Sequence, residues 1–230
     1  MRLDKYLAHA TGSSRKEVKR ALHKKMVTVN ALVVKDSSFQ VTSNDIITYR
    51  QQALEAPKQR YYMLNKPQGY VCSNDDPSHP TVAGLLSDEL RPDLLNIAGR
   101  LDVDTTGLLL LTTDGQWLHK VTSPNHKQAK RYLVETTEVI EQSAIDLFKK
   151  GVMLNSEKQP TKPAMLEIQN SHIAYLTLTE GKYHQVKRMF AAIGNKVTEL
   201  HRDRIANIAL DETLNPGEYR ELTASEIALI

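Results

Sequence analysis

The sequence has little of what disulfides, membrane spans and structural metals require. Its 230 residues include one cysteine, Cys72, so no internal disulfide can form and a reducing compartment is favoured. The longest apolar run, Leu108 to Leu111, is far shorter than the roughly 20 residues that span a bilayer. No group of Cys and His residues has zinc-ligand spacing, and the first ten residues carry charges where a signal peptide is apolar. These absences predict a cytoplasmic protein without a structural metal.

Positive charge is concentrated at the N-terminus. Of the 30 Lys and Arg residues, eight lie within residues 1–25 against only Asp4 and Glu17, which gives this segment a net charge of +6. The remainder has 22 basic and 25 acidic residues, a net charge of −3. The asymmetry favours a small basic binding module joined to a near-neutral body, although a basic helix can also be merely a solvated face.

The first 50 residues predict a small α+β module. Apolar residues at helical spacing predict a helix over the first ten residues, which Gly12 ends. Ser14 and Glu17 form a capping box that opens a second helix, running to about Lys25. Three short β-rich runs follow, at Val27–Val29, Leu32–Val34 and Ile46–Tyr49. Residues 51–60 are polar and aperiodic and predict a linker.

Residues 61–230 predict a second, larger domain. Two helices are expected, one over about Ser143 to Lys150 before Gly151 and one over about His184 to Ile193 before Gly194, and a short terminal helix opens at Thr223. Strands without regular alternation of helices favour an α+β fold with a mixed, mainly antiparallel sheet. The strand candidates are Tyr61–Leu64, Leu108–Thr112, Arg131–Thr136, Met165–Ile168, Ala174–Leu178 and Lys196–Leu200.

The densest chemical signal is GRLDVDTTGLLLLTTDG, from Gly99 to Gly115. The DVDTTG stretch imitates the start of a calcium-binding EF-hand loop, but the twelfth position is Thr113 where that loop needs a bidentate Glu. Asp102 and Asp104 could instead be the acid and nucleophile of a glycosidase, although two aspartates in a loop are also common turn chemistry. Calcium binding is therefore excluded, and the glycosidase stays open on the residues alone.

The N-terminal segments RLDKYLA, SSRKEVKRAL, VTVN and NDIITY resemble the S4 RNA-binding domain. The resemblance covers residues 1 to about 50 and implies that basic side chains neutralise RNA phosphates, an interaction that is strong and insensitive to base sequence. The RNA-binding residues it implies are Arg2, Lys5, Arg15, Lys16, Lys19, Arg20 and Lys24.

The Gly99–Gly115 stretch resembles the signature GRLDxxTxGLLLLTxDG of the pseudouridine synthases that act on ribosomal RNA, in the branch with an S4 domain. The aspartate of GRLD is catalytic in that family, which implies this role for Asp102 and leaves Asp104 a structural one. Arg100, beside it, is suited to hold a phosphate or to fill the space that a flipped base leaves; this is a hypothesis.

Two further motifs resemble the same family. KRY at Lys130 implies that Tyr132 lies against the target base, and EGKYHQVKRMF at Glu180 implies that Lys187 pairs with the catalytic aspartate, with Arg188 as a near alternative. Leu200 matches an apolar position at the active site.

The resemblance also implies the reaction and the partner. Converting uridine to pseudouridine is an isomerisation, so no cofactor is expected. The stretch from GRLD to HKVTSP is most similar to members that act on small-subunit (16S) ribosomal RNA. The alternatives are a synthase for large-subunit RNA and a non-catalytic assembly factor that binds RNA through S4 contacts alone. Nothing in the sequence indicates an obligate oligomer, so a monomer is expected.

Overall fold

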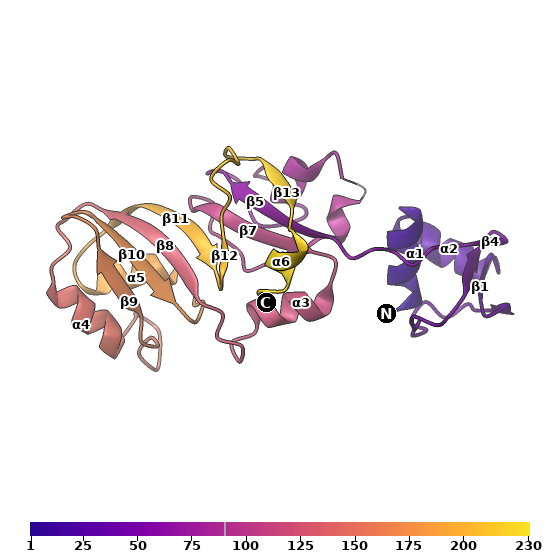
Figure 1. The fold of residues 1–230 in the computed structure, drawn as a ribbon, viewed down its shortest axis with the longest axis horizontal. Coiled ribbons are helices and arrows are strands. Elements are labelled where there is room, and N and C mark those ends of the chain that lie inside the picture. The colour runs from indigo at the N-terminus through magenta and orange to yellow at the C-terminus, as the bar shows by residue number, and fades with distance from the viewer. Residues whose placement is uncertain (90) are drawn as a thin grey trace. The chain divides into compact units, whose positions relative to one another are not determined.

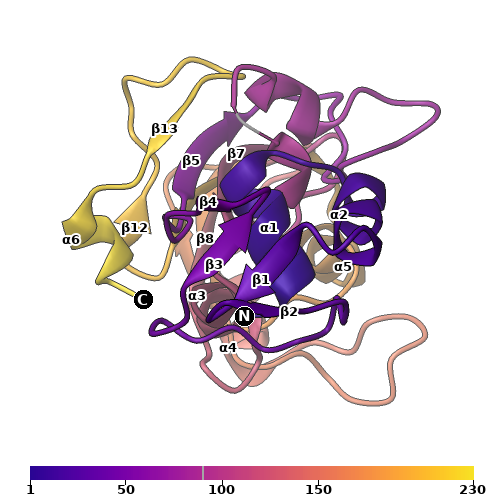
Figure 2. The ribbon, with the colours of Figure 1, turned by 90° about the vertical axis from the view of Figure 1, so that its right-hand side faces the viewer.

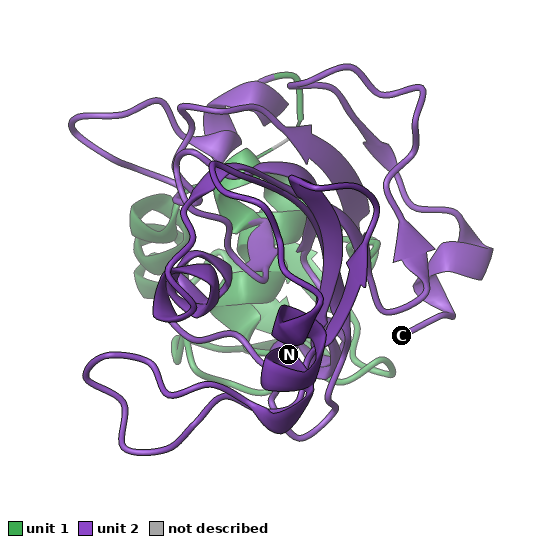
Figure 3. Cartoon of the chain, turned by 90° about the vertical axis from the view of Figure 1, so that its left-hand side faces the viewer, with its two compact units in different colours: residues 1–59, 88–94 green, residues 60–87, 95–230 purple. Residues whose placement is uncertain are grey.

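The computed structural model describes residues 1–89 and 91–230. The chain forms two compact units: unit 1 is Met1–Gln59 with Asp88–Leu94, and unit 2 is Arg60–Ser87 with Leu95–Ile230 (Figure 3). In the part of the chain that is described, no helix is long and apolar enough to cross a membrane.

Unit 1 packs two helices against a small antiparallel sheet (Figure 2). Its apolar core includes Leu3, Leu7, Leu22, Val27 and Ile47. The predicted capping box is present, because Ser14 and Glu17 each bond the other's backbone N–H. The elements are α1 (Leu3–Thr11), α2 (Arg15–His23) and a sheet of order β2-β1-β3-β4, made of β1 (Val27–Val29), β2 (Leu32–Val33), β3 (Ile47–Tyr49) and β4 (Gln52–Ala53).

Unit 1 extends beyond residues 1–50 in two ways. Gln52–Ala53, within the range expected as linker, pairs with β3 as strand β4. The segment Asp88–Leu94, expected in the larger domain, belongs to unit 1: Leu94 packs on its core, and Arg91 bonds the carbonyl oxygens at the end of α1. This segment includes the 3-10 turn η2 (Pro92–Leu94). Its membership follows from contacts between residues far apart in the sequence, which local patterns do not reveal.

Unit 2 is built on one mixed sheet of order β13-β5-β7-β11-β8-β10-β9, with β6 beside β7 and β12 beside β11 (Figure 1). All these strand pairs are antiparallel except β7 with β11, which are parallel. The α+β prediction with a mainly antiparallel sheet is therefore confirmed. The strands are β5 (Tyr61–Lys66), β6 (Asn96–Ala98), β7 (Thr106–Thr112), β8 (Lys130–Thr136), β9 (Met165–Ile168), β10 (Ile173–Leu178), β11 (Val197–Ile205), β12 (Ile208–Ala209) and β13 (Tyr219–Glu221).

Strand β7 is buried on both faces, which explains its run of four leucines. Leu108 and Leu110 join one apolar cluster, with Trp117 of α3. Leu109 and Leu111 join another, with Val82 and Leu86 of the 3-10 turn η1. Alternate side chains of a strand point to opposite faces, so a continuous apolar run fits a strand covered on both. The helical elements are η1 (Val82–Leu86), α3 (Gly115–Thr122), α4 (Ser143–Lys150), α5 (Gln185–Ala192) and α6 (Ala224–Ile227).

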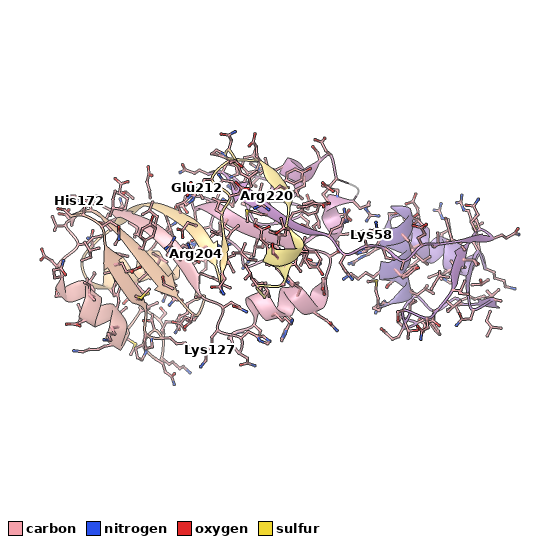
Figure 4. The ribbon with its side chains drawn as sticks, in the orientation of Figure 1. Lys58, Lys127, His172, Arg204, Glu212 and Arg220 are labelled. Carbon is pink, nitrogen blue, oxygen red and sulfur yellow. The ribbon has the colours of Figure 1, made fainter. Side chains whose placement is uncertain are left out.

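Some elements of unit 2 depart from the prediction. Helix α3 was not predicted; the Asp114 side chain caps it by accepting from the backbone N–H groups of Gln116 and Trp117. Strand β11 continues past Leu200, its predicted end, to Ile205. Strand β13 was also not predicted, and its Arg220 (labelled in Figure 4) bridges Asp211 and Glu226, which ties α6 to the sheet.

The parallel pair β7–β11 explains the glycine that ends the DTTG motif. Gly107 has a φ of +99°, and a Cβ placed there would lie 2.3 Å from the backbone oxygen of Arg202. Only glycine tolerates both this conformation and this approach. The close contact brings the Gly99–Thr105 loop next to the middle of β11, where the candidate site forms.

Candidate active site

A cavity of about 1120 Å³ opens in unit 2 at the Gly99–Thr105 loop. Its walls come from this loop, from β8 and β11, and from the segment that leads into α5. Six of the residues singled out in the sequence line it: Arg100, Asp102, Asp104, Tyr132, Lys187 and Leu200. Residues from separate motifs along the chain therefore meet in one pocket.

The loop that carries Asp102 is held in place by hydrogen bonds from a buried lysine. Lys66, at the end of β5, is 0% exposed, and its Nζ donates to the carbonyl oxygens of Val103 (3.3 Å) and Thr105 (2.8 Å). Burial lowers the pKa of Lys66. The backbone N–H of Gly69 also donates to Val103 (2.8 Å). The turn around Asp102 is thus held by groups that do not enter the pocket.

Replacing Lys66 with Met should weaken both stability and catalysis. The Val103 and Thr105 carbonyls would lose a charged donor, so the free energy of unfolding should fall by about 1–3 kcal/mol. Turnover should fall by roughly 10²-fold, since small displacements of a reacting group have effects of that size. Urea unfolding and single-turnover kinetics measure the two effects, with the exposed Lys58→Met as the matched control. If Lys66→Met and Lys58→Met have equal stability and equal turnover, Lys66 does not hold the Asp102 loop.

Two basic side chains from the α5 region face the Asp102 carboxylate. Its Oδ2 lies 3.8 Å from Lys187 Nζ, and its Oδ1 lies 3.5 Å from His184 Nε2. Lys187 also donates to Asp104 Oδ1 at 2.5 Å. Burial alone would raise the pKa of Asp104, but the hydrogen bond and charge of Lys187 outweigh it, so that pKa is lowered. Lys187 therefore bridges the two aspartates and holds them on one side of the pocket.

His184 was not predicted from the sequence. It precedes α5 with a φ of +47°, a left-handed conformation that is uncommon for a residue other than glycine. Its ring stacks on Tyr183, with centroids 3.8 Å apart. It lies within the EGKYHQVKRMF motif, three residues before Lys187. The sequence does not show which groups this histidine faces.

Tyr132, Leu200 and Arg202 are part of the wall contributed by the sheet. Tyr132 of β8 lies opposite Arg202 of β11, and the guanidinium carbon of Arg202 lies 6.0 Å from the Tyr132 ring centroid. Leu200 is buried two residues before Arg202 on the same face of β11. The sequence prediction ended β11 at Leu200 and therefore missed Arg202.

Arg100 and Arg188 have different surroundings. Arg100 is exposed at the pocket wall. Arg188 instead pairs with Glu157 (3.3 Å) and donates to the carbonyl oxygens of Tyr183 and Asn155. In the structure Lys187 is the neighbour of Asp102, while Arg188 joins the 155–157 loop to α5.

The basic residues of unit 1 are mostly displayed to solvent. Arg15, Lys16, Lys19 and Arg20 of α2, and Lys24 after it, are exposed, while Val18, Ala21 and Leu22 are buried on the other side of the helix. Arg2 is engaged by Asp4, which accepts two hydrogen bonds from it (3.1 and 2.7 Å). Lys5 is partly buried on α1. The strongest basic surface of unit 1 is therefore α2.

No group of three or more His, Cys, Asp or Glu side chains that could hold a metal ion occurs within residues 1–89 and 91–230. The pocket is lined by many ionisable side chains and by two tyrosines, Tyr132 and Tyr183, and its Asp102 carboxylate lies between His184 and Lys187.

Comparison with known proteins matches both units. The family model for RNA pseudouridylate synthase matches residues 60–192, and the S4 domain model matches residues 1–47. The chain is 51% identical over 231 residues to ribosomal small subunit pseudouridine synthase A of Salmonella typhimurium, with both chains fully covered. The proteins of that name from Escherichia coli and Haemophilus influenzae are 50% and 49% identical, with 98% or more of each chain covered.

A solved structure agrees with this relationship. A crystal structure of a pseudouridylate synthase has 48% sequence identity and a TM-score of 0.73, and the match covers both chains fully. The resemblance that the GRLD, KRY and HQVK motifs indicated is confirmed. The protein is therefore a member of the RNA pseudouridylate synthase family that carries an S4 domain at its N-terminus.

Proposed function

We propose that this enzyme converts a uridine of 16S ribosomal RNA to pseudouridine, with Asp102 as the catalytic carboxylate. The observation that carries the proposal is the Asp102 carboxylate in a pocket between His184 and Lys187 (3.5 and 3.8 Å). The small-subunit names of relatives that are about half identical over their full length support 16S RNA as the substrate. Such a substrate also favours the cytoplasm as the location.

The reaction accounts for the composition of the pocket. The N1–C1′ bond of uridine breaks, the uracil rotates, and a C5–C1′ bond forms. The product is an isomer of the substrate, so no oxidant, reductant or water is consumed and no cofactor is required. Asp102 acts at the ribose, either by bonding to C1′ or by removing a ribose proton. Lys187 keeps the carboxylate in position in either case.

A uridine within folded RNA must leave its stack to reach this pocket. Enzymes that act on bases in this way flip the nucleotide out and hold it against aromatic or apolar side chains. We assign this role to Tyr132, with Leu200 as its apolar neighbour on β11. Stacking of a base on an aromatic ring is worth roughly 1–3 kcal/mol, which helps to offset the cost of unstacking.

Arg100 is placed to act on the RNA rather than on the ribose bond, because it is exposed beside Asp102. Replacing it with Ala should raise the Kd for RNA or lower kcat by roughly 10- to 100-fold, as expected for loss of one charge-assisted contact worth about 1.5–3 kcal/mol. Filter binding and single-turnover kinetics measure both quantities, and Arg100→Lys should restore part of the loss because it keeps the charge. If Arg100→Ala leaves affinity and turnover unchanged, the role is wrong.

Unit 1 supplies affinity for RNA that does not depend on base sequence. Its exposed basic face on α2 can neutralise phosphates, and release of counterions from RNA makes such binding strong and sensitive to salt. Asp102, Tyr132 and Lys187 come together within unit 2, so the proposed chemistry needs no second copy, and we propose that the enzyme acts as a monomer.

Tritium release tests the reaction and the substrate together. Forming the C5–C1′ bond expels the hydrogen on C5, so RNA made with 5-tritiated uridine releases tritium in proportion to the pseudouridine formed. We expect release from unmodified 16S RNA or its assembly particles, levelling off near one equivalent per RNA, and none from 23S RNA. Release from 23S RNA alone would identify a large-subunit enzyme. No release from either, with RNA still bound, would favour a binding protein.

A further inference from the structure

Two cations meet beside Tyr132 in the wall of the pocket. Lys130 and Tyr132 are two residues apart on β8 and so lie on the same face of the sheet, and Arg202 is the partner of Tyr132 across the strand pair. Gly99, with a φ of +86°, borders them: a Cβ placed there would lie 3.8 Å from Nη1 of Arg202 and 3.8 Å from Cε of Lys130. The missing side chain at Gly99 leaves both cations facing the same space.

Neither cation has a carboxylate partner. Lys130 Nζ donates to the carbonyl oxygen of Gln128 (3.1 Å), and Arg202 donates through Nε to Leu108 (2.9 Å) and through Nη2 to Gly99 (2.7 Å). Among residues 1–89 and 91–230, no carboxylate oxygen lies within 4.0 Å of a side-chain nitrogen of either one. Arg202 is only 1% exposed. Burial, helped by the charge of Arg202, lowers the pKa of Lys130 to about 8.

Buried charge of one sign is unfavourable for folding unless something compensates it. A structural role would normally pair each cation with Asp or Glu, as Arg131 of β8 is paired with Asp203 of β11 at 2.5 Å. Among the described residues, the partner of the neighbouring Lys130 is the neutral carbonyl of Gln128. The two cations of the pocket wall are therefore arranged for a negative group that arrives with the substrate.

The reaction itself produces such a group next to Tyr132. When the N1–C1′ bond breaks, its electron pair stays on the uracil, whether Asp102 has bonded to C1′ or has removed a ribose proton. The detached uracil is an anion whose charge is shared by N1 and the two carbonyl oxygens. It then bonds to C1′ through C5. On the first route the Asp102–C1′ bond breaks and frees the carboxylate, and on the second Asp102 returns its proton to the ribose. C5 loses its hydrogen as a proton and N1 gains one, so the atoms and charge of substrate and product balance.

We propose that Lys130 and Nη1 of Arg202 bind a carbonyl oxygen of the uracil and stabilise the negative charge that develops when the base detaches. The inference rests on the proposed function and adds Lys130 as a catalytic residue of the same pocket. Fixed positive groups aimed at developing charge in a site shielded from water are among the strongest contributions to catalysis. An RNA phosphate has the same oxygen-anion chemistry, and the experiment separates the two.

The test compares Lys130→Met with Lys149→Met, which removes an exposed lysine from α4 outside the pocket. At saturating 16S substrate, the single-turnover rate constant of Lys130→Met should fall by roughly 10²–10³-fold, the usual effect of removing one donor to a developing oxyanion. Its Kd for RNA, measured in an Asp102→Asn background, should stay within about twofold, and the slope of log Kd against log salt should not change. Lys149→Met should match the wild type, and thermal unfolding verifies that both variants fold.

A pH profile of the wild type adds a readout that a structural role would not change. Because the lysine acts while protonated, the rate should fall as the pH rises through about 8, and Lys130→Arg should move this decline to higher pH. The other ionisable or charged groups that line the pocket are Cys72, Asp76, Arg100, Asp102, Asp104, Tyr132, Lys162, Glu180, Lys182, Tyr183, His184, Lys187 and Arg202. Lys130→Met should lack the decline, which assigns it to Lys130.

The outcomes are distinct. A wild type that makes no pseudouridine would count against the proposed function itself. An active wild type with Lys130→Met within about twofold of it would overturn the inference. A salt slope reduced by about one, with weaker binding and an unchanged saturated rate, would overturn it in favour of a phosphate contact.

Discussion

Asp102→Asn is expected to abolish pseudouridine formation while the protein still folds and binds RNA. Asparagine has nearly the same shape but cannot bond to C1′ or accept a ribose proton, so the single-turnover rate constant should fall by at least roughly 10⁴-fold, as when a nucleophile is removed. Tritium release from 16S RNA measures the rate. The Kd should change by less than about tenfold, because Asp102 is one residue of a large interface.

Asp104→Asn is the matched control, because Asp104 lies in the same loop and contacts the same lysine. Lys187 is closer to Asp104 (2.5 Å) than to Asp102 (3.8 Å), so distance to the cation does not by itself identify the catalytic carboxylate. Loss of Asp104 leaves Lys187 able to turn fully to Asp102, and we expect turnover to fall by less than about tenfold, the size of one exposed ion pair. A larger loss in Asp104→Asn than in Asp102→Asn would reverse the assignment.

A second large effect is expected from the basic face of unit 1. Replacing the four basic residues of α2 with Gln should raise the Kd for 16S RNA by roughly 10²-fold at physiological salt and reduce the slope of log Kd against log salt by about three. The saturated rate constant should not change, because these residues supply affinity and not chemistry. Filter binding at several salt concentrations measures the effect. The four residues are Arg15, Lys16, Lys19 and Arg20.

Substitution is a cleaner test than deletion of the N-terminal residues, because Asp88–Leu94 is part of unit 1 and would lose its core. The Ser14–Glu17 capping box also remains intact in the substituted helix. The control is a variant with four exposed lysines of unit 2 replaced by Gln, which keeps the change in net charge equal. An equal change of slope in both variants would mean that α2 is not the RNA-binding face. The control residues are Lys120, Lys149, Lys150 and Lys196.

Local patterns predicted the elements whose ends are marked by their own residues. Helix α4 begins and ends where it was expected, at Ser143 and Lys150, because Gly151 follows it. Helix α3 was missed since Gly115 and β-branched residues are poor helix formers. Its stability comes from the Asp114 cap and from Trp117, which packs in the core and donates to Ile227. The two residues of that hydrogen bond are 110 positions apart, so no local sequence pattern predicts it.

Residues named from a sequence motif could be expected to lie in one pocket. Residues that reach the pocket through contacts made only in the fold could not. Asp102, Tyr132 and Lys187 stand in motifs, and the fold brings all three to one pocket. Arg202 lies in the segment HRDR, which is too polar to be recognised as a strand from the sequence. Its side chain can be buried because it donates to carbonyl oxygens of β7 and Gly99. His184 and Lys130 gain their positions from α5 and from the β8–β11 pair. A sequence shows the types of these side chains but not which carboxylate, carbonyl or ring each one faces.

Pseudouridine mapping, by carbodiimide labelling and primer extension on unmodified 16S RNA or its assembly particles, tests directly whether this pocket isomerises one uridine through Asp102. Wild type and Asp102→Asn are treated side by side. We predict one new stop with the wild type, at a single uridine, and none with the variant. A stop with both proteins would contradict the role of Asp102, and no stop with the wild type on either form of 16S RNA would contradict the substrate.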